Sequence, residues 1–461
     1  MKNTFMIAFL CLLLTVVLIT GCAPGGTSTL DDSPEPAMQE TASGGEQETP
    51  ADTTDTDNIT LIQYIQAPDE TSPRAVLFRE FANQFEANNP GVTVEFRLSP
   101  AQDFDMFFKT AVAAGEQIDV VDVNIQFYRD YVRSGFLLDI TDRLDLDRIN
   151  ILDMAWEQLH FFSMDDSIYG VPIELGTTGF YYNRAIFQDL GIEYPETWDD
   201  MYELRDILAP HGIYTMVYAG AEPWWNPMHF NMIFYQYTNN NGLAVNDLFM
   251  SGDFSDEVIL PYIQTIQHLA DLENDRIFMP GTQGMDHVAA ASAFVNGQAA
   301  TFFMGSWFIE TVEEIKPEDF EYGIFPVPIL AGSGNVSQTP GSVGSPQSVF
   351  SGSQHPDLAM ELIHQMVSVE NMRVKSAELA NFVNIFYGAE GYNPVPAMAY
   401  LEAIAPSTVI WLDAIWEPEI ISDFQLGVQS AILGNQTPAE VMDDIIAHYQ
   451  RLREEGRVFI P

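Results

Sequence analysis

The sequence predicts an α/β protein, because strand-like and helix-like segments alternate along most of its length. Short runs rich in β-branched residues are followed repeatedly by amphipathic helical stretches, from about Ile59 onward. Of the 461 residues, 47% are hydrophobic and 12% are aromatic, which is enough to bury more than one core. Alternating strands and helices are typical of layered domains with mostly parallel sheets.

Three early strands are indicated by their residue patterns. One is a short β-rich run, one alternates between apolar and polar residues, and one is a continuous apolar run of the kind found in buried strands. They are expected at residues 59–65, 92–98 and 118–123.

Helix starts are marked by capping signals. A serine followed by proline offers an N-cap with proline at the first helical position, and Thr-x-x-Asp or Thr-x-x-Glu forms a capping box. We expect helices to begin at Ser72-Pro73, Thr197 (with Asp200), His355-Pro356 and Thr437 (with Glu440).

The amino terminus has the features of a targeting segment. Lys2 precedes an apolar run from Phe5 to Ile19, which is too short to span a bilayer as a helix. The following Gly21-Cys22 resembles the lipobox of bacterial lipoproteins, so we expect a signal peptide at residues 1–21 and lipid on the sulfur of Cys22. A plain secretory signal or an anchor helix is the alternative.

Residues 22–58 contain Gly, Ser, Thr, Pro and acidic residues, with almost no large apolar side chain. Such a segment cannot bury enough surface to offset the entropy cost of ordering. We therefore expect a disordered acidic tether between the lipid and a folded body, on the outer face of the cytoplasmic membrane.

Charge and missing motifs exclude several functions. The chain has 18 Lys and Arg against 66 Asp and Glu, a formal charge of −48, which disfavours nucleic-acid binding. The cysteines, Cys11 and Cys22, both precede the body, so no disulfide framework or cysteine metal site is expected. No HExxH, GxxxxGK[ST], GxSxG or strand-following GxGxxG motif occurs, so we expect no enzyme, metal or cofactor. A catalytic carboxylate pair remains an open alternative.

Several blocks together resemble the family 1 extracellular solute-binding proteins, the maltose-binding-protein-like receptors of ABC importers. The blocks appear in the family's order over most of the body. They are FANQFEANNPGVTVEFR (81–97), AVAAGEQIDVVDVN (111–124), YVRSGFLLDIT (131–141), YGVPIELGTTGFYYNRAIFQDLGIEYPETWDDMYEL (169–204), AFVNGQAATFFMGSW (293–307), YGIFPVP (322–328) and GNQTPAEVMDDI (434–445).

The resemblance implies a two-lobed periplasmic-binding-protein-like fold of type II, with each sheet mostly parallel and flanked by helices. Lobe 1 is then expected at 59–172 plus about 340–380, and lobe 2 at 173–339 plus about 381–461. It also implies a monomer that holds a solute between its lobes and presents it to membrane permease subunits. A sugar or oligosaccharide is favoured; a polyol, a polyamine or a sensing role is the alternative.

Candidate ligand residues combine aromatic faces, which pack against sugar rings, with planar polar groups that bind hydroxyls. The resemblance favours Trp307 of Gly-Ser-Trp. Trp224 and Trp225, flanked by prolines, are expected in a loop that points both indoles outward.

Polar residues extend this predicted site. Asn124 and Gln126 follow a buried strand at its carboxyl end, where open α/β sheets bind ligands. Some sugar-binding relatives carry an acid four residues after Pro172; this chain has Gly176, so Glu174 and Thr177 are the possible substitutes. Segments that line the cleft in relatives add Tyr64, Gln66, Gly341, Ser342, Trp411 and Trp416.

Overall fold

The structure is a computed structural model that describes residues 58–163, 165–331, 336–379, 383–393, 395–405 and 408–458. The predicted signal peptide, Cys22 and all of the tether except Asn58 lie outside these residues. Residues 56–461 form one compact unit. Within the described residues, no helix combines the length and the apolar character needed to cross a bilayer.

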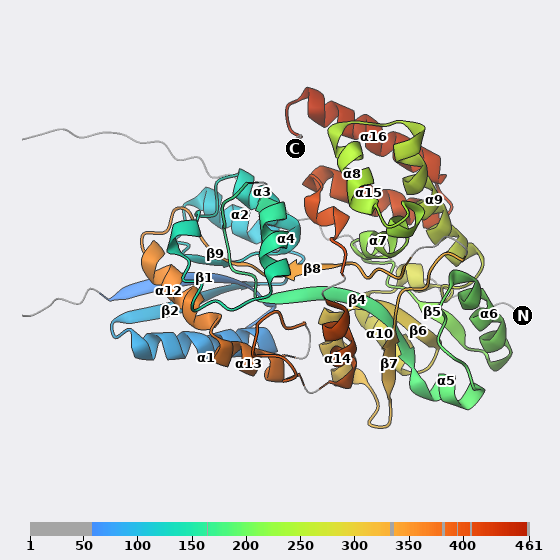
Figure 1. The fold of residues 1–461 in the computed structure, drawn as a ribbon, viewed down its shortest axis with the longest axis horizontal. Helices are drawn as coiled ribbons and strands as arrows, with labels where there is room; N and C mark the ends of the chain where they lie inside the picture. The colour runs from blue at the N-terminus through green and yellow to red at the C-terminus, as the bar shows by residue number, and fades with distance from the viewer. Residues whose placement is uncertain are drawn as a thin grey trace, which may run out of the picture. The chain divides into compact units, whose positions relative to one another are not determined.

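A four-stranded sheet organises the first lobe. Its strand order is β2-β1-β3-β9, and β1 is parallel to both neighbours while β9 is antiparallel to β3. The strands are β1 (Ile59–Gln66), β2 (Val92–Ser99), β3 (Val120–Asp122) and β9 (Gln347–Val349). The associated helices, on both sides of this sheet in Figure 1, are α1 (Pro73–Asn88), α2 (Phe104–Ala114), α3 (Ile125–Arg133), α4 (Asp153–Ser163), α12 (Pro356–Met366) and α13 (Val369–Glu378).

A second sheet organises the other lobe, with the order β5-β6-β4-β7. Its strands are β4 (Glu174–Asn183), β5 (Tyr214–Val217), β6 (Ala299–Gly305) and β7 (Tyr322–Phe325), and β8 (Gly341–Gly344) pairs with the start of β4. The helices are α5 (Arg184–Leu190), α6 (Trp198–Leu208), α7 (Trp225–Tyr237), α8 (Gly242–Ser251), α9 (Asp256–Asn274), α10 (His287–Val295), α11 (Ile309–Ile315), α14 (Pro396–Ile404), α15 (Pro418–Ile432) and α16 (Pro438–Glu454).

The expectation of a mostly parallel second sheet is wrong. Strand β4 is antiparallel to β6, β7 and β8, and only β5 and β6 are parallel. Figure 1 shows the reason: β4 enters this sheet from the first lobe instead of returning through a crossover helix within the second. Strand–helix alternation predicts parallel pairing only for strands that such a crossover joins.

The predicted helix starts are confirmed, although the side chains of Ser72 and His355 make no capping hydrogen bond. Both capping boxes, at Thr197/Asp200 and Thr437/Glu440, have their two reciprocal hydrogen bonds. Helices α1 and α12 begin with proline directly after Ser72 and His355. Leu77, Phe81 and Phe85 share the buried face of α1, at 4%, 1% and 0% exposure.

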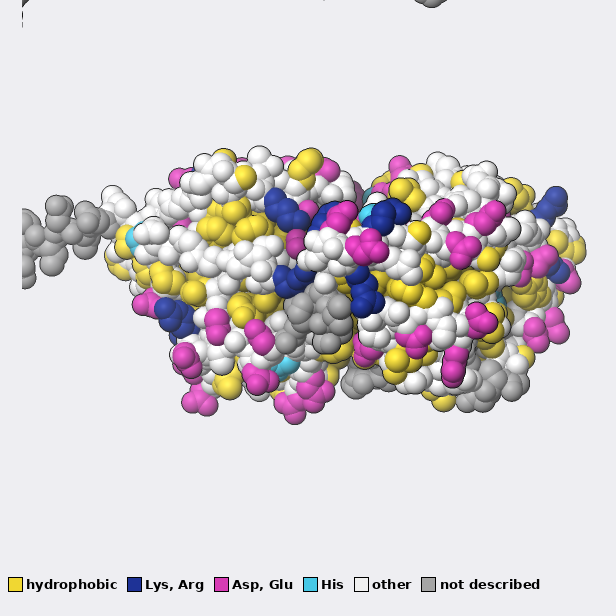
Figure 2. Space-filling view, turned by 90° about the horizontal axis from the view of Figure 1, so that it is seen from above, with side chains coloured by type: hydrophobic (Ala, Val, Ile, Leu, Met, Phe, Trp, Pro, Cys, Tyr) yellow, Lys and Arg dark blue, Asp and Glu magenta, His cyan; other side chains and the backbone are white. Residues whose placement is uncertain are grey.

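Charged side chains are distributed unevenly over the surface. In Figure 2, acidic groups are scattered across the face shown, while most of the basic ones gather between its left and right halves. The described residues contain no group of three His, Cys, Asp or Glu side chains arranged to hold a metal ion.

A close helix contact gives a test of the packing between α15 and α16. A Cβ added at Gly427 would lie 2.6 Å from Cγ1 of Val441. Alanine improves helix propensity by about 1 kcal/mol, but overpacking of this kind costs about 1–3 kcal/mol. We expect Gly427→Ala to lower the free energy of unfolding by about 1 kcal/mol in urea melts. The double variant Gly427→Ala with Val441→Ala should lose less unfolding free energy than the two single variants lose together. A Gly427→Ala protein more stable than the wild type would contradict the close contact.

Candidate functional site

Strand β4 changes its pairing partners where it passes between the lobes. Residues Glu174 to Thr177 pair with β8, and the next residues pair with β6 and then β7. The backbone N–H of Thr177 donates to Oγ of Ser306, 3.5 Å away, which places the turn after β6 beside this crossing. The crossing therefore brings together segments that are more than 100 residues apart in the chain.

Two of the predicted ligand residues are buried hydroxyls at this crossing. Thr177 and Ser342 are 0% and 2% exposed, and among the described residues neither side-chain oxygen has a hydrogen-bond partner. Gly341 lies opposite Thr177, and a Cβ there would come within 2.7 Å of the carbonyl oxygen of Gly176. Gly341 thus allows the close approach of β8 to β4.

Trp307 lies in the short 3-10 helix η4 (Ser306–Phe308), directly after β6. Its indole is half-buried and lies over Gly305, where an added Cβ would be 2.3 Å from two ring carbons. The ring of Trp411 is 6.1 Å away at an angle of 61°. The structure therefore brings two of the predicted tryptophans together, and glycine in the Gly-Ser-Trp motif leaves room for the indole.

The other tryptophan pair only partly agrees with the expectation. Trp224 is half-buried, and its ring stacks against Trp225 at 4.8 Å and against Phe308 at 6.0 Å. Trp225 is the first residue of α7 and is 0% exposed, with its Nε1 donating to Glu222. The expectation that both indoles point outward is wrong for Trp225, because Phe302 and Phe308 cover it.

Gln126 contacts a carboxylate that the sequence did not single out. Its Nε2 donates to Oδ2 of Asp413 at 2.7 Å, and Nδ2 of Asn231 donates to the other oxygen at 3.2 Å. Asp413 is 4% exposed, and burial raises its pKa although both amides oppose this shift. Asn124 is the N-cap of α3 and accepts a hydrogen bond from the backbone of Gln126.

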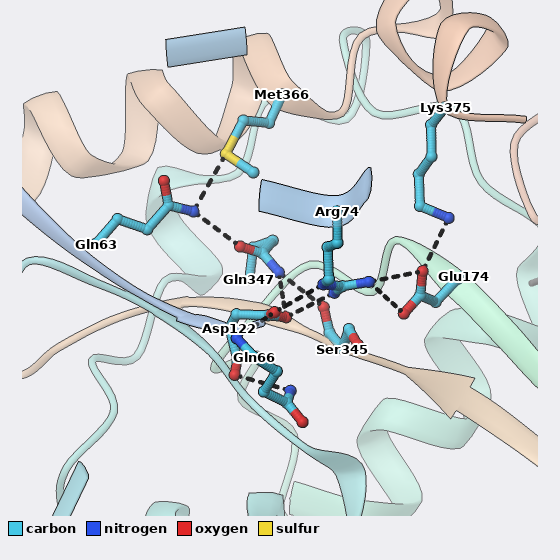
Figure 3. Close-up of polar contacts among 9 residues, drawn as sticks. All are labelled: Gln63, Gln66, Arg74, Asp122, Glu174, Ser345, Gln347, Met366 and Lys375. Carbon is cyan, nitrogen blue, oxygen red and sulfur yellow. Dashed lines mark hydrogen bonds and ion pairs between the residues drawn. The ribbon is translucent and has the colours of Figure 1, made fainter. Parts of the chain in front are cut away.

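Glu174 is part of a buried ionic network, shown in Figure 3 and referred to below as the β4 ion network. Its carboxylate lies 3.2 Å from Arg74 and 2.8 Å from Lys375, and Arg74 also pairs with Asp122 at 3.0 Å. Both carboxylates are 0% exposed. Two acids and two bases from α1, β3, β4 and α13 therefore compensate one another, with both acids and Lys375 buried and Arg74 partly exposed.

Electrostatics differ between the two acids of this network. Burial opposes the charge of Glu174, but the attraction of Arg74 and Lys375 outweighs it and lowers the pKa to about 2. Burial raises the pKa of Asp122 despite Arg74, and burial lowers the pKa of Lys375 despite Glu174. Glu174 is the carboxylate that the network holds ionised most firmly.

The remaining predicted residues lie in different surroundings. Gln66 is held through its backbone N–H and its Nε2 by Asp122. Tyr64 is 0% exposed and donates to Glu116, and Trp416 is 4% exposed and donates to Asn246. The structure therefore groups Trp307 with Trp411, Thr177 with Gly341 and Ser342, and Gln66 with Glu174 near Asp122, but not Tyr64 or Trp416 with these.

Two surface hollows contain none of the predicted ligand residues. One lies beside α1 and α12, where Arg148 and Glu361 form a bidentate ion pair, and the other lies beside α5 and includes Tyr194. Asp413 and Asn231, which the sequence analysis missed, lie beside the predicted ligand residue Gln126. The signal for Asp413 was its position between Trp411 and Trp416.

The β4 ion network predicts acid sensitivity. The pKa of Glu174 is about 2 in the folded protein against 4.5 for an unperturbed group. Its stabilising contribution is therefore present above about pH 4.5 and is lost as the pH falls towards 2. Glu174→Gln leaves the buried Lys375 and the partly exposed Arg74 with one carboxylate, Asp122, so we expect it to cost about 3 kcal/mol at pH 7 in urea melts.

Two comparisons check this result. The free energy of unfolding of Glu174→Gln should fall less steeply than that of the wild type between pH 4.5 and 2. Glu174→Gln with Lys375→Met should lose less than the two single changes combined. The network would be contradicted if the two losses of unfolding free energy simply added and if Glu174→Gln lost stability as steeply as the wild type between pH 4.5 and 2.

Sequence comparison identifies relatives among bacterial receptors. The profile of the family described as bacterial extracellular solute-binding protein matches residues 69–373. The chain is 24% identical to the multiple sugar-binding protein of Streptococcus mutans over 54% of this chain and 58% of the relative. It is 25% identical to the arabinooligosaccharide-binding protein of Bacillus subtilis over 55% and 57%. The matched part thus spans less than two thirds of either relative.

Solved structures extend the likeness to nearly whole chains. A chitin oligosaccharide binding protein aligns with a TM-score of 0.73 at 21% identity, covering 86% of this chain and 99% of that one. The solute-binding protein RafE in complex with raffinose aligns with a TM-score of 0.66 at 22% identity, covering 86% and 99%. The chain has the two-lobed α/β fold of these proteins, and it belongs to the bacterial extracellular solute-binding protein family.

Proposed function

We propose that this protein is a lipid-anchored extracellular receptor that binds a sugar or oligosaccharide between its lobes and delivers it to the permease of an ABC importer. It acts by binding, without catalysis and without a cofactor, as a monomer. The first lobe comprises 59–172 plus about 340–380, and the second comprises 173–339 plus about 381–461. In support, α12 and α13 pack on α1 of the first sheet, whereas α15 and α16 pack on α9.

The observation that carries the proposal is the pairing of Trp307 with Trp411 beside the β4 crossing. Indole faces pack against the C–H faces of pyranose rings, and buried hydroxyls or amides bind sugar hydroxyls. Thr177 and Ser342 supply buried hydroxyls that no described residue hydrogen-bonds, and Gln126 supplies an amide. The same ligand class is supported by the names of similar proteins: a multiple sugar-binding protein, an arabinooligosaccharide-binding protein and a chitin oligosaccharide binding protein.

A ligand screen followed by one substitution tests the proposal. Thermal-shift measurements should find a stabilising ligand among maltose, raffinose, stachyose, chitin oligosaccharides and arabinooligosaccharides, and none among polyamines or amino acids. For the tightest sugar, Trp307→Ala should weaken binding about 30-fold in calorimetry, equivalent to about 2 kcal/mol. Gly305→Ala should weaken binding too, because it displaces the indole without removing it.

The control is the core tryptophan Trp198, which is 2% exposed. Trp198→Ala should lower the free energy of unfolding by about 3–5 kcal/mol, more than Trp307→Ala does. Unchanged affinity of Trp307→Ala together with a large loss of stability would place Trp307 in the core. If only a polyamine stabilised the protein in the thermal-shift screen, the ligand would be a polyamine and not a sugar.

The anchor has a separate test. Only Cys22 follows the apolar run at the position where lipid is attached in the lipobox, so Cys22→Ala should release the protein from the membrane fraction. Cell fractionation followed by immunoblotting measures this. A Cys22→Ala protein that still sediments with membranes would show that the amino-terminal segment is not a lipoprotein signal.

A further inference from the structure

A short segment of the second lobe runs along one helix of the first. Residues 409–417, here called the clasp segment, include the 3-10 helix η6 (Leu412–Ile415) and lead into α15. Helix η6 contacts both α3 and α7. Helix α3 belongs to the first lobe, since Tyr131 packs on Phe108 of α2 with ring centroids 4.7 Å apart.

The clasp segment is anchored to the second lobe by several hydrogen bonds. Tyr235 on α7 donates to the carbonyl oxygen of Ile410 at 2.8 Å. Asn231, one turn earlier on α7, accepts from the backbone N–H of Leu412 and donates to Asp413. At the far end, the indole of Trp416 donates to Asn246 at 2.7 Å. The segment therefore moves with α7 and α8.

Helix α3 meets this segment with one face. Gln126, Arg129 and Arg133 are spaced i, i+3 and i+7, so they lie on the same side of the helix. They contact every second residue of the segment: Gln126 donates to Asp413 at 2.7 Å, Arg129 to the carbonyl oxygen of Ile415 at 3.2 Å, and Arg133 to Glu417 at 2.7 Å. These three contacts in register join the lobes directly.

Asp413 differs from the other residues of the clasp segment because its two carboxylate oxygens accept hydrogen bonds from opposite lobes. Gln126 comes from α3 of the first lobe and Asn231 from α7 of the second. Asp413 is buried, and the described side chains that bond to it are neutral amides. A buried carboxylate without a cation contributes little to stability, so its value lies in specifying one arrangement of its partners.

Glu417 continues the junction of the lobes at the start of α15, whereas Glu419 forms its ion pair within the second lobe. Glu417 pairs with Arg133, and Glu419 pairs with Arg457 beyond the end of α16. Figure 2 shows basic side chains gathered between the two halves of the face, in a chain with only 18 Lys and Arg. Arg133 of the first lobe thus compensates Glu417 of the second across the junction.

We propose that Asp413 is a positioning residue that clasps Gln126 of the first lobe to Asn231 of the second, and that this clasp sets how far the lobes separate. Its consequence for affinity rests on the proposed function. If a ligand binds only when the lobes are together, its apparent dissociation constant rises as the clasped fraction falls. The clasp is then part of the affinity of the receptor although Asp413 need not touch the ligand.

Hydrogen exchange of the full chain, without ligand, tests the clasp first. Asp413→Ala should raise exchange both in the clasp segment, residues 409–417, and in α3, residues 125–133, because each loses the contact that joins them. The matched control is Asp443→Ala, which removes one exposed charge from α16. Asp413→Asn should restore part of the protection, since an amide can accept from one partner and donate to the oxygen of the other.

A double substitution separates the clasp from a general loss of stability. Gln126→Leu breaks the same hydrogen bond from the other lobe. If both changes act through one contact, exchange of the clasp segment should rise no further in Asp413→Ala with Gln126→Leu than in Asp413→Ala alone. The proposal would be overturned if Asp413→Ala raised exchange only in the clasp segment and not in α3. It would also be overturned if Asp443→Ala raised exchange as strongly as Asp413→Ala does.

Affinity is measured with maltose, raffinose, stachyose and chitin oligosaccharides as probes. Asp413→Ala should bind the tightest of these about tenfold more weakly than Asp443→Ala does. An unchanged affinity with released α3 would show that the clasp does not govern binding. If no sugar binds the wild type, the proposed function fails while the exchange result still decides whether the clasp exists.

Discussion

The ion pairs of Glu174 with Arg74 and Lys375 fix the start of β4, and the arrangement of both lobes depends on that strand. Arg74 also binds Asp122 on β3, so the first residue of β4 is tied to the first sheet. From there β4 continues as a buried strand between β6 and β7 of the second sheet. Since both acids are buried, the network tolerates little displacement without leaving a charge uncompensated.

The position of β4 determines which segments meet at the junction of the lobes. Its first residues hold β8, and the turn after β6 brings Ser306 and Trp307 beside the same point. The clasp segment then crosses from the second lobe, with Trp411 against Trp307 and Asp413 against Gln126. Aromatic faces, buried hydroxyls and amides therefore come together because one strand passes through both lobes.

Local sequence signals predicted many of the helix starts and buried faces, because such features depend on residues only a few positions apart. The capping boxes at Thr197 and Thr437 and the buried face of α1 are of this kind. The direction of β4 in the second sheet is set by its origin in the first lobe, and no periodicity within the strand carries that information.

The candidate site was predictable only in part, because its geometry depends on contacts between residues that are far apart in the chain. The Gly-Ser-Trp motif at Gly305 predicts Trp307 as a ligand residue, and the structure places it beside Trp411. The burial of Trp225 depends on Phe302 and Phe308, which lie more than 70 residues away. Glu174 is polar and follows Gly-Val-Pro, as a ligand residue would, yet the cations that hold it lie 100 residues before it and 201 after it. The role of Asp413 likewise depends on two amides from distant helices.

We propose that a sugar binds against the tryptophans beside the β4 crossing. The most direct measurement is a crystal structure of the protein with its tightest-binding sugar. The expected result is a pyranose ring with its C–H face on the indole of Trp307 or Trp411, with ring atoms within about 4.5 Å, and hydroxyls bonded to side chains of both lobes. A sugar bound elsewhere, or to one lobe with both indoles uncovered, would contradict the claim.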